Sequence, residues 1–223
     1  MITVHHLNNS RSQRILWLLE ELGVEYTVKR YERDAKTMLA PPELRQVHPL
    51  GKSPVIVDGR QTLAESGAII EYLADKYGHD QGLAPAADSG ERVRYLYWLH
   101  YAEGSAMPPM LMSLIMSRIK TAPMPFFVRP IAKGIADKAM SGFIGPQIKL
   151  HLSYMNDELG KHPWFVGKKF SAADIQMSFP IEAAAARAGL DKYPHLKAWL
   201  AKIQSRPAYL RALEKGGPYE LMK

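Results

Sequence analysis

The segment Asn8 to Ser12 (NNSRS) crowds amide and hydroxyl side chains between a short strand pattern and an amphipathic helical pattern over residues 11–22. A hydroxyl at a helix N-terminus can donate a hydrogen bond to a thiolate, and the positive end of the helix favours that anion. The carboxyl end of a strand is also where α/β proteins place ligands. Asn and Ser are equally good helix N-caps, so the segment alone leaves a structural role and a chemical role open.

Glu65 and Ser66 begin a second helical pattern, which extends to residue 77. Ser66 could cap that helix and Glu65 could complement its dipole, which is a complete structural explanation. Free amides at a helix N-terminus together with a serine hydroxyl also bind carboxylates, and a neighbouring glutamate binds an ammonium group. The pair could therefore hold the head group of an α-amino acid.

Lys52-Ser53-Pro54 precedes an apolar strand pattern. A cis bond before Pro54 would turn the backbone of Ser53 away from the sheet and leave it free to pair with a peptide ligand. Only about 5–6% of X-Pro bonds in folded proteins are cis, so the tripeptide alone favours a plain strand start. Further along the chain, Ser171 and Asp174 have the spacing of a capping box, which we interpret as structural.

The elements that must position these residues form two groups. Residues 1–77 follow the order strand, helix, strand, loop, hairpin, helix, which is the size and order of a thioredoxin-like α/β unit. Helical patterns fill the remainder, over residues 91–120, 147–159, 172–188, 194–205 and 207–215, with prolines marking a break after residue 120. We therefore predict an α/β domain over residues 1–78, a linker over 79–90 and an all-α helical bundle over 91–223.

Composition excludes several classes of protein. With 47% hydrophobic residues among 223, the chain can bury a sizeable core, and with no cysteine it has no disulfide, no thiolate metal site and no cysteine nucleophile. Any thiol chemistry must use a thiol from a substrate. The eight histidines follow no metal-binding spacing, so we expect no metal.

The net charge of +7 lies entirely in residues 78–223, where the basic residues are scattered along the sequence. No segment has the pattern of a nucleic-acid recognition element, and a mild field that attracts small anions fits better. We also expect no membrane partner, because the most apolar stretch is short and broken by prolines, and no signal peptide, which favours a cytoplasmic location.

The segments SRSQRILWLLEELG, HPLGKSPVIVDG, LAESGAIIEYLADKYG and WFVGKKFSAADI together resemble the cytosolic glutathione transferases, over nearly the whole chain and in the order of that family. The resemblance implies that the first domain binds glutathione, that the protein forms a homodimer and that it serves in detoxification. The family supplies a Tyr, Ser or Cys to the glutathione sulfur from the loop after the first strand. Ser10 falls on that position, so the chain resembles the serine-type members of bacteria and fungi, with Asn9 as the reserve candidate.

The resemblance also implies roles for the other candidates. Ser53, before a cis-proline, would pair through its backbone with the cysteinyl part of glutathione, and its side chain would face the site where the family usually has Val. Lys52 would reach the glycine carboxylate, and Glu65 and Ser66 would bind the γ-glutamyl group. The arginine that often follows the Glu-Ser pair is Gly67 here. A histidine expected near Met38 and Leu39 is also missing, so part of the usual polar network is absent or comes from elsewhere.

The acceptor pocket should lie between the first loop and the long helix after the linker, where Tyr101, Met107 and Met110 are candidates for its apolar wall. The alternative is that these side chains simply form core. We expect conjugation of the glutathione thiolate to a small hydrophobic electrophile, without a metal. Two alternatives stay open: glutathione-dependent reduction of disulfides or peroxides, and a non-catalytic binding protein of the same fold.

Overall fold

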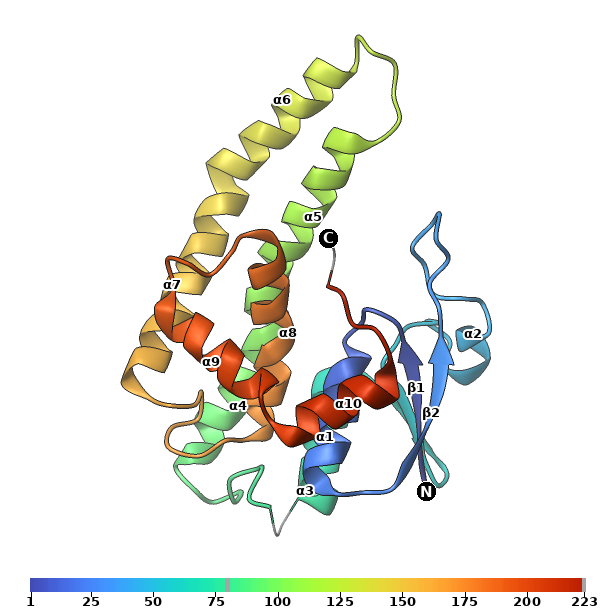
Figure 1. The fold of residues 1–223 in the computed structure, drawn as a ribbon, viewed down its shortest axis with the longest axis vertical. Helices are drawn as coiled ribbons and strands as arrows, with labels where there is room; N and C mark the ends of the chain where they lie inside the picture. The colour runs from blue at the N-terminus through green and yellow to red at the C-terminus, as the bar shows by residue number, and fades with distance from the viewer. Residues whose placement is uncertain (79–80, 222–223) are drawn as a thin grey trace.

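The computed structural model describes residues 1–78 and 81–221, and it confirms a thioredoxin-like domain followed by a helical domain (Figure 1). The first domain contains, in chain order, β1 (Ile2–Leu7), α1 (Ser12–Leu22), β2 (Tyr26–Tyr31), α2 (Leu44–Val47), β3 (Val55–Asp58), β4 (Gln61–Ala64) and α3 (Ser66–Tyr77). The strands form one sheet in the order β2-β1-β3-β4. These elements agree with the predicted ones to within a few residues.

The sheet contains parallel and antiparallel strand pairs. β1 and β2 are parallel with α1 as the crossover, and Val4 lies opposite Val28. On the other side of β1, Val4 lies opposite Ile56 of the antiparallel β3, and β3 turns into β4 through Asp58 and Gly59. Gly59 has a φ of 60°, which glycine adopts without steric cost. The hairpin predicted at this point is confirmed, and β1 is a central strand whose carboxyl end opens toward the loop Asn8–Arg11.

α1 is the structural centre of the molecule. Ile15, Leu16, Leu18 and Leu19 are fully buried, and Trp17 is 1% exposed. The helix packs on β1 and α3 of its own domain and on α8 (Ala172–Arg187) and α10 (Pro207–Gly216) of the helical domain. The start of α1 therefore lies where both domains meet.

Two long helical rods dominate the second domain. The first contains α4 (Glu91–Tyr101), the π-helical turn η1 (Ala102–Ala106) and α5 (Met107–Thr121). The second contains α6 (Arg129–Ala139), the π-helical turn η2 (Met140–Ile144) and α7 (Gly145–Lys161). α9 (Pro194–Gln204) and α10 follow α8. Single π turns inside helices often mark functional positions.

The second rod corrects one prediction. We expected its helical pattern to begin at residue 147, with Pro130 inside a break, but α6 already begins at Arg129. Pro130 occupies the first turn of that helix, where the missing N–H has no helical partner in any case. A proline that seemed to interrupt a helix starts one.

The capping box predicted at Ser171 and Asp174 is confirmed. The Asp174 carboxylate accepts the backbone N–H of Ser171 at 3.0 Å, the backbone N–H of Phe165 at 3.0 Å and the indole N–H of Trp199 at 3.4 Å. Asp174 is fully buried, and burial raises its pKa to about 6 although these hydrogen bonds oppose that shift. One carboxylate thus joins the start of α8 to the preceding loop and to α9.

We predict that Asp174→Ala lowers the free energy of unfolding by about 3–5 kcal/mol, because three buried N–H groups lose their acceptor. Urea unfolding followed by circular dichroism measures the change. Asp191→Ala is the matched control, because Asp191 pairs with Lys197 at the surface and is 89% exposed, and it should change stability by less than about 0.5 kcal/mol. Equal effects of the two substitutions would contradict the role assigned to Asp174.

Candidate functional site

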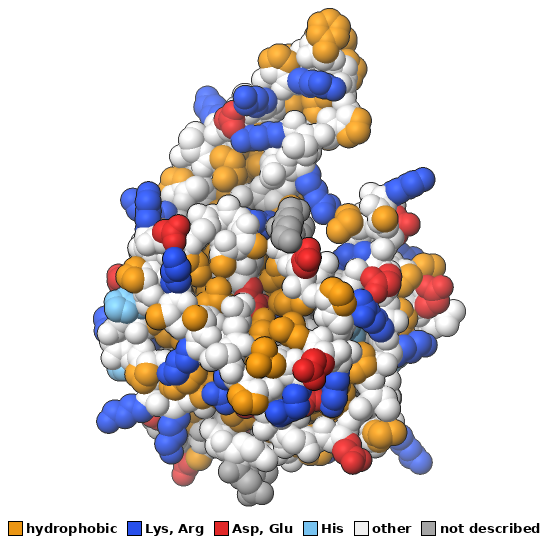
Figure 2. Space-filling view, in the orientation of Figure 1, with side chains coloured by type: hydrophobic (Ala, Val, Ile, Leu, Met, Phe, Trp, Pro, Cys, Tyr) orange, Lys and Arg blue, Asp and Glu red, His pale blue; other side chains and the backbone are white. Residues whose placement is uncertain are grey.

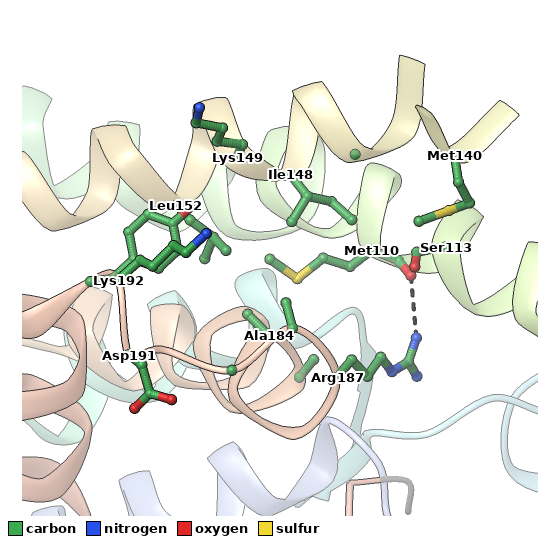
Figure 3. A pocket seen from close by; sticks show the side chains of 15 residues that line it. Met110, Ser113, Met140, Ile148, Lys149, Leu152, Ala184, Arg187, Asp191 and Lys192 are labelled. Carbon is green, nitrogen blue, oxygen red and sulfur yellow. Dashed lines mark hydrogen bonds between the residues drawn. The ribbon is translucent and has the colours of Figure 1, made fainter. Parts of the chain in front are cut away.

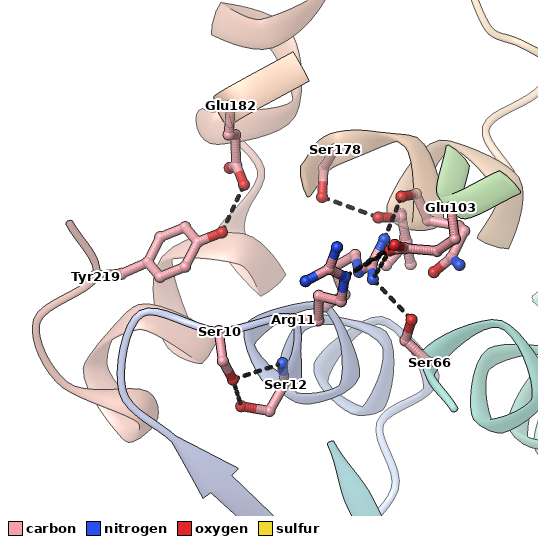
Figure 4. A network of polar contacts seen from close by, with 11 residues as sticks. Ser10, Arg11, Ser12, Ser66, Glu103, Ser178, Glu182 and Tyr219 are labelled. Atoms are coloured by element: carbon pink, nitrogen blue, oxygen red, sulfur yellow. Dashed lines mark hydrogen bonds and ion pairs between the residues drawn. The ribbon is translucent and has the colours of Figure 1, made fainter. Parts of the chain in front are cut away.

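Ser10 lies at the carboxyl end of β1 and just before α1, with 4% of its surface exposed. Its hydroxyl oxygen accepts the backbone N–H of Ser12 at 3.2 Å and lies 2.7 Å from the Ser12 hydroxyl (Figure 4). Ser10 thus satisfies an N–H at the start of α1 and also places a hydroxyl beside the positive end of that helix. The structural and chemical roles left open by the sequence are compatible.

The buried side chain of His6 contacts the Ser12 hydroxyl. The Ser12 hydroxyl lies 2.9 Å from Nδ1 of His6, and the His6 ring hydrogen-bonds the backbone of Gly216. Burial, followed by the charge of Arg30, lowers the pKa of His6 to about 4, so the ring is neutral at pH 7. The Gly216 contact raises that pKa, so its partner atom is the carbonyl oxygen, which takes the single ring N–H and leaves Nδ1 as an acceptor for the Ser12 hydroxyl.

The other side of the site contains an arginine that sequence reasoning missed. Arg14 is 1% exposed, and its Nη2 donates to the Ser66 hydroxyl at 2.7 Å and to Glu103 Oε1 at 2.6 Å. Its Nη1 donates to the carbonyl oxygen of Gln176 at 2.6 Å. One guanidinium therefore connects α1 with α3, η1 and α8.

Arg11 completes a three-charge cluster with Arg14 and Glu103 (Figure 4). Nε of Arg11 donates to both carboxylate oxygens of Glu103, at 2.8 and 2.9 Å. Burial alone would raise the pKa of Glu103, but the charges and hydrogen bonds of Arg14 and Arg11 outweigh it and hold that pKa below its usual value. Two cations and one anion leave a net positive charge beside Ser66, which favours an anionic ligand.

Glu65 and Ser66 lie as predicted at the start of α3, but the capping role considered for Ser66 is not the one observed. Ser66 is the first helical residue, Glu65 is the N-cap, and no side chain caps the helix. Glu65 is exposed and has a φ of 70°, a conformation that is rare for a residue with a side chain. Such strained residues cluster at ligand sites.

The bond between Ser53 and Pro54 is cis, as the family resemblance implies. The Ser53 side chain corrects our expectation that it faces the site, because its hydroxyl donates to the carbonyl oxygen of His5 at 2.9 Å and accepts the N–H of Leu7 at 3.3 Å. The last residue pair of β1 with β3 is His5 with Val55. The Ser53 hydroxyl provides hydrogen-bond partners for the backbone of β1 at the end of this pairing. Lys52 beside it is exposed.

Both domains of this chain match models of known protein families. Residues 1–75 match the family model "Glutathione S-transferase, N-terminal domain" and residues 121–207 match "Glutathione S-transferase, C-terminal domain". Glutathione S-transferase 1 of Saccharomyces cerevisiae is 38% identical over 225 residues, covering 96% of this chain and 95% of that protein. This chain belongs to the glutathione S-transferase family.

Solved structures agree with this assignment. A glutathione S-transferase of Actinobacillus pleuropneumoniae superposes with a TM-score of 0.81 at 34% identity, covering 99% of this chain and 95% of that one. A glutathione transferase family member of Pseudomonas fluorescens, described with two glutathione bound, has a TM-score of 0.73 at 28% identity and covers 96% of this chain and 92% of its own. Disulfide-bond oxidoreductase YfcG of Escherichia coli is 29% identical over 224 residues, covering 96% of this chain and 95% of that protein.

Arg14 contacts the Glu-Ser pair of this glutathione S-transferase family member through the Ser66 hydroxyl, whereas the residue after that pair is not an arginine. Gly67 occupies that position, and a Cβ there would lie 3.4 Å from the side-chain nitrogen of Gln176. The cation beside Ser66 belongs to α1. The sequence contained one signal for a buried Arg14. Arg14, Leu18 and Leu22 follow one another at intervals of four residues, so Arg14 lies on the apolar stripe of α1.

The C-terminal tail after α10 covers the Ser10 loop. Asn9, with a φ of 48°, accepts the backbone N–H of Glu220 through its side-chain oxygen at 2.7 Å. Tyr219 donates its hydroxyl hydrogen to Glu182 of α8 at 2.8 Å, on the side of the site that Figure 4 shows above Ser10. The amide oxygen of Asn9 is thus engaged, whereas no described residue accepts its amide hydrogens.

The structure does not bring the three candidates for the acceptor pocket into one cavity. Tyr101 is 7% exposed, and its hydroxyl lies 2.6 Å from Nδ1 of His151 among the aromatic rings of α4 and α7. Met107 is also buried, but it does not line the cavity between α5, α7 and α8. Met110 does line that cavity, which has a volume of about 640 Å³ and includes Met140, Ile148, Leu152 and Arg187 (Figure 3). No candidate glutathione-binding residue lines it.

The pKa of His6 leads to a stability prediction. Between pH 6.5 and about 4 the unfolded histidine binds a proton that the folded one does not, so stability should fall as the pH decreases through this window. The total loss attributable to His6 is about 3 kcal/mol, at about 1.4 kcal/mol per pH unit. Urea unfolding at several pH values should show this loss in the wild type and not in His6→Asn. Other titrating groups contribute equally to the two plots of unfolding free energy against pH. Parallel plots for the wild type and His6→Asn would therefore contradict the lowered pKa of His6.

Proposed function

We propose that this protein conjugates the thiolate of glutathione to small electrophiles. The observation that carries the proposal is the buried Ser10 hydroxyl at the N-terminus of α1, beside a chain of polar groups that leaves its hydrogen available. Membership of the family and the glutathione molecules described in a relative support glutathione as the thiol. With no cysteine in the chain, the sulfur must come from the substrate.

The enzyme's task is to lower the pKa of the bound thiol. A free thiol with a pKa near 8.5 is only a few per cent ionised at neutral pH, and the thiolate is the nucleophile. Each pKa unit requires about 1.4 kcal/mol of extra stabilisation of the anion. A hydrogen bond to a charged group contributes about 1.5–3 kcal/mol and a helix N-terminus about 0.3–1 kcal/mol, so Ser10 with α1 can supply one to two units.

His6 and Ser12 determine which way the Ser10 hydrogen points. The Ser12 hydrogen has two acceptors, Nδ1 of the neutral His6 ring at 2.9 Å and the carbonyl oxygen of Leu7 at 3.3 Å, which leaves the Ser12 oxygen to accept from Ser10 at 2.7 Å. The Ser10 oxygen accepts the N–H of Ser12 and keeps its own hydrogen. When glutathione binds, that hydrogen can turn from the Ser12 oxygen to the sulfur. Ser10 acts as a donor and not as a base, because a serine hydroxyl is too weak an acid to ionise here.

The remaining candidates hold the parts of glutathione that do not react. We assign the γ-glutamyl carboxylate to Ser66 and the N-terminus of α3, next to the positive charge of Arg14. Glu65 pairs with the γ-glutamyl ammonium, Lys52 with the glycine carboxylate, and the backbone of Ser53 with the cysteinyl unit. The Ser53 hydroxyl is occupied by β1, so only its backbone serves the ligand.

Glutathione-dependent disulfide reduction is a second candidate, and the similarity to a disulfide-bond oxidoreductase favours it. The glutathione thiolate would attack one sulfur of a disulfide, and the other sulfur would leave as a thiolate and take up a proton. A second glutathione would then attack the mixed disulfide, releasing the second thiol and glutathione disulfide. The chain needs no cysteine for this sequence. Assays of the purified protein with an aryl halide and with a small disulfide discriminate between the two activities, and inactivity in both with glutathione bound would indicate a binding protein.

We predict that Ser10→Ala raises the pKa of the bound glutathione thiol by about one to two units while changing affinity little. Ultraviolet titration of the complex measures the thiolate directly. Ser10→Thr, which keeps a hydroxyl, is the control and should titrate like the wild type. If Ser10→Ala titrates like the wild type, Ser10 is not the donor, and Asn9→Ala becomes the variant to measure.

We further predict that Ser66→Ala raises KM for glutathione by roughly 5- to 150-fold, which corresponds to a hydrogen bond to a charged group of about 1–3 kcal/mol. The γ-glutamyl group differs little between ground and transition states, so kcat should stay within a few fold. Glu65→Gln should likewise raise KM for glutathione and leave kcat within a few fold. The control Ser205→Ala, at the exposed end of α9, should change neither KM nor kcat. A folded Ser66→Ala variant with a collapsed kcat and an unchanged KM would refute this placement of glutathione.

A further inference from the structure

The hairpin formed by α5 and α6 extends from the body of the molecule (Figure 1). α6 packs on α5 and on the adjoining turn η2, and it makes no comparable contact with another described element. The connection over residues 122–128 forms the tip of the hairpin, far from the sheet (Figure 1). A flat surface can therefore approach the tip without meeting the rest of the protein.

The tip exposes large apolar side chains. Phe126 is 82% exposed and Phe127 is 65% exposed, and on α6 the next two residues of the same stripe, Ile131 and Ile135, are 64% and 65% exposed. Ile119 adds to this surface from α5. Figure 2 shows orange side chains at the tip. Large apolar side chains exposed close together on a folded protein indicate an interaction site.

The hairpin tip and the adjoining turns of α5 and α6 are also rich in positive charge. Residues 118–138 contain five basic residues and one acidic residue, so 21 residues carry four of the seven net positive charges of the chain. The bases are Arg118, Lys120, Arg129, Lys133 and Lys138. The acid, Asp137, pairs with Lys120, whereas Arg129 and Lys138 have no ion pair among the described residues. Blue side chains flank the apolar tip in Figure 2.

We propose that this hairpin tip docks on an anionic lipid surface. Phe126 and Phe127 would enter the boundary between headgroups and acyl chains, and the basic residues of the adjoining turns would contact the lipid phosphates. Among the described residues no helix combines the length and hydrophobicity needed to cross a bilayer. We expected no membrane partner because no segment of the sequence could span a bilayer. Peripheral docking on a lipid surface does not require a spanning segment.

Charge favours lipid over the other possible occupants. A second copy presenting the same tip would bring four positive charges against four, which disfavours contact of one tip with another. A nucleic acid would complement the charge and could stack on the phenylalanines, but it offers nothing to the aliphatic stripe of Ile131 and Ile135. An anionic bilayer complements both the charge and the apolar surface.

Co-sedimentation with vesicles tests the proposal. The full-length protein should bind vesicles of phosphatidylcholine mixed with phosphatidylserine and should bind phosphatidylcholine alone at least tenfold more weakly. Raising the salt from about 0.1 to about 1 M, which shortens the Debye length from about 10 to about 3 Å, should release it. Absence of binding to the mixed vesicles, or equal binding to both kinds, would overturn the proposal.

Variants locate the surface. Phe126→Ala with Phe127→Ala should lower the partition coefficient at least tenfold, and Arg129→Gln with Lys133→Gln should lower it several fold. The matched controls are Leu210→Ala, an exposed leucine on α10, and Lys168→Gln with Lys169→Gln, an exposed basic pair far along the chain. All variants should keep the thermal unfolding midpoint and the glutathione-dependent activity of the wild type.

Other outcomes assign the surface differently. If the phenylalanine variant keeps vesicle binding but shifts the oligomeric state in sedimentation velocity, the tip is a contact between copies and the proposal is wrong. If the tip variants lose binding to single-stranded DNA and not to vesicles, the occupant is a nucleic acid. Equal losses of vesicle binding in the tip variants and the lysine control would show a general charge effect and would also refute the proposal.

Discussion

The geometry of the site depends on one buried cation. Arg14 is surrounded by protein and bonds at once to the first residue of α3, to Glu103 in the π turn η1 and to the backbone of α8. An uncompensated buried charge costs several kcal/mol, so the guanidinium requires all these acceptors to be in place. Glu103 lies in the π turn η1 between α4 and α5. The sheet domain and the helical domain are therefore held in one relative position at the place where glutathione would bind.

A second chain of polar contacts couples the Ser10 loop to α10. The carbonyl of Gly216 orients His6, His6 orients Ser12, and Ser12 orients Ser10. Gly216 is a glycine because a Cβ would lie 2.7 Å from the Gln13 side chain and 2.9 Å from Leu16. This close approach of α10 to α1 brings the backbone carbonyl to the histidine. The tail that follows reaches Asn9, so the last helix supports both candidates for the sulfur ligand.

The sequence predicted most of the local elements and the candidate residues of the sheet domain, because they depend on contacts between near neighbours in the chain. The helix after Asn8–Ser12, the hairpin at Asp58–Gly59 and the capping box at Ser171 all have local signals. Arg14 was not predicted, because its partners lie 52 to 162 residues away and only the folded chain brings them together. The Ser53 hydroxyl was misassigned for the same reason, since its partners are the backbone groups of β1. The gathered charge of the hairpin also required α6, which the sequence pattern did not show.

The central claim is that the site ionises the glutathione thiol on binding. Titration calorimetry at neutral pH, in buffers of different ionisation enthalpy, measures the protons released when glutathione binds. At pH 7 the account predicts release of about 0.2–0.7 proton per glutathione, because the free thiol is almost fully protonated and a thiol whose pKa is lowered by one to two units is about a quarter to three quarters ionised in the complex. S-methylglutathione, which has the same binding groups and no thiol proton, should bind without release. Tight binding of glutathione with no more proton release than S-methylglutathione would contradict the account.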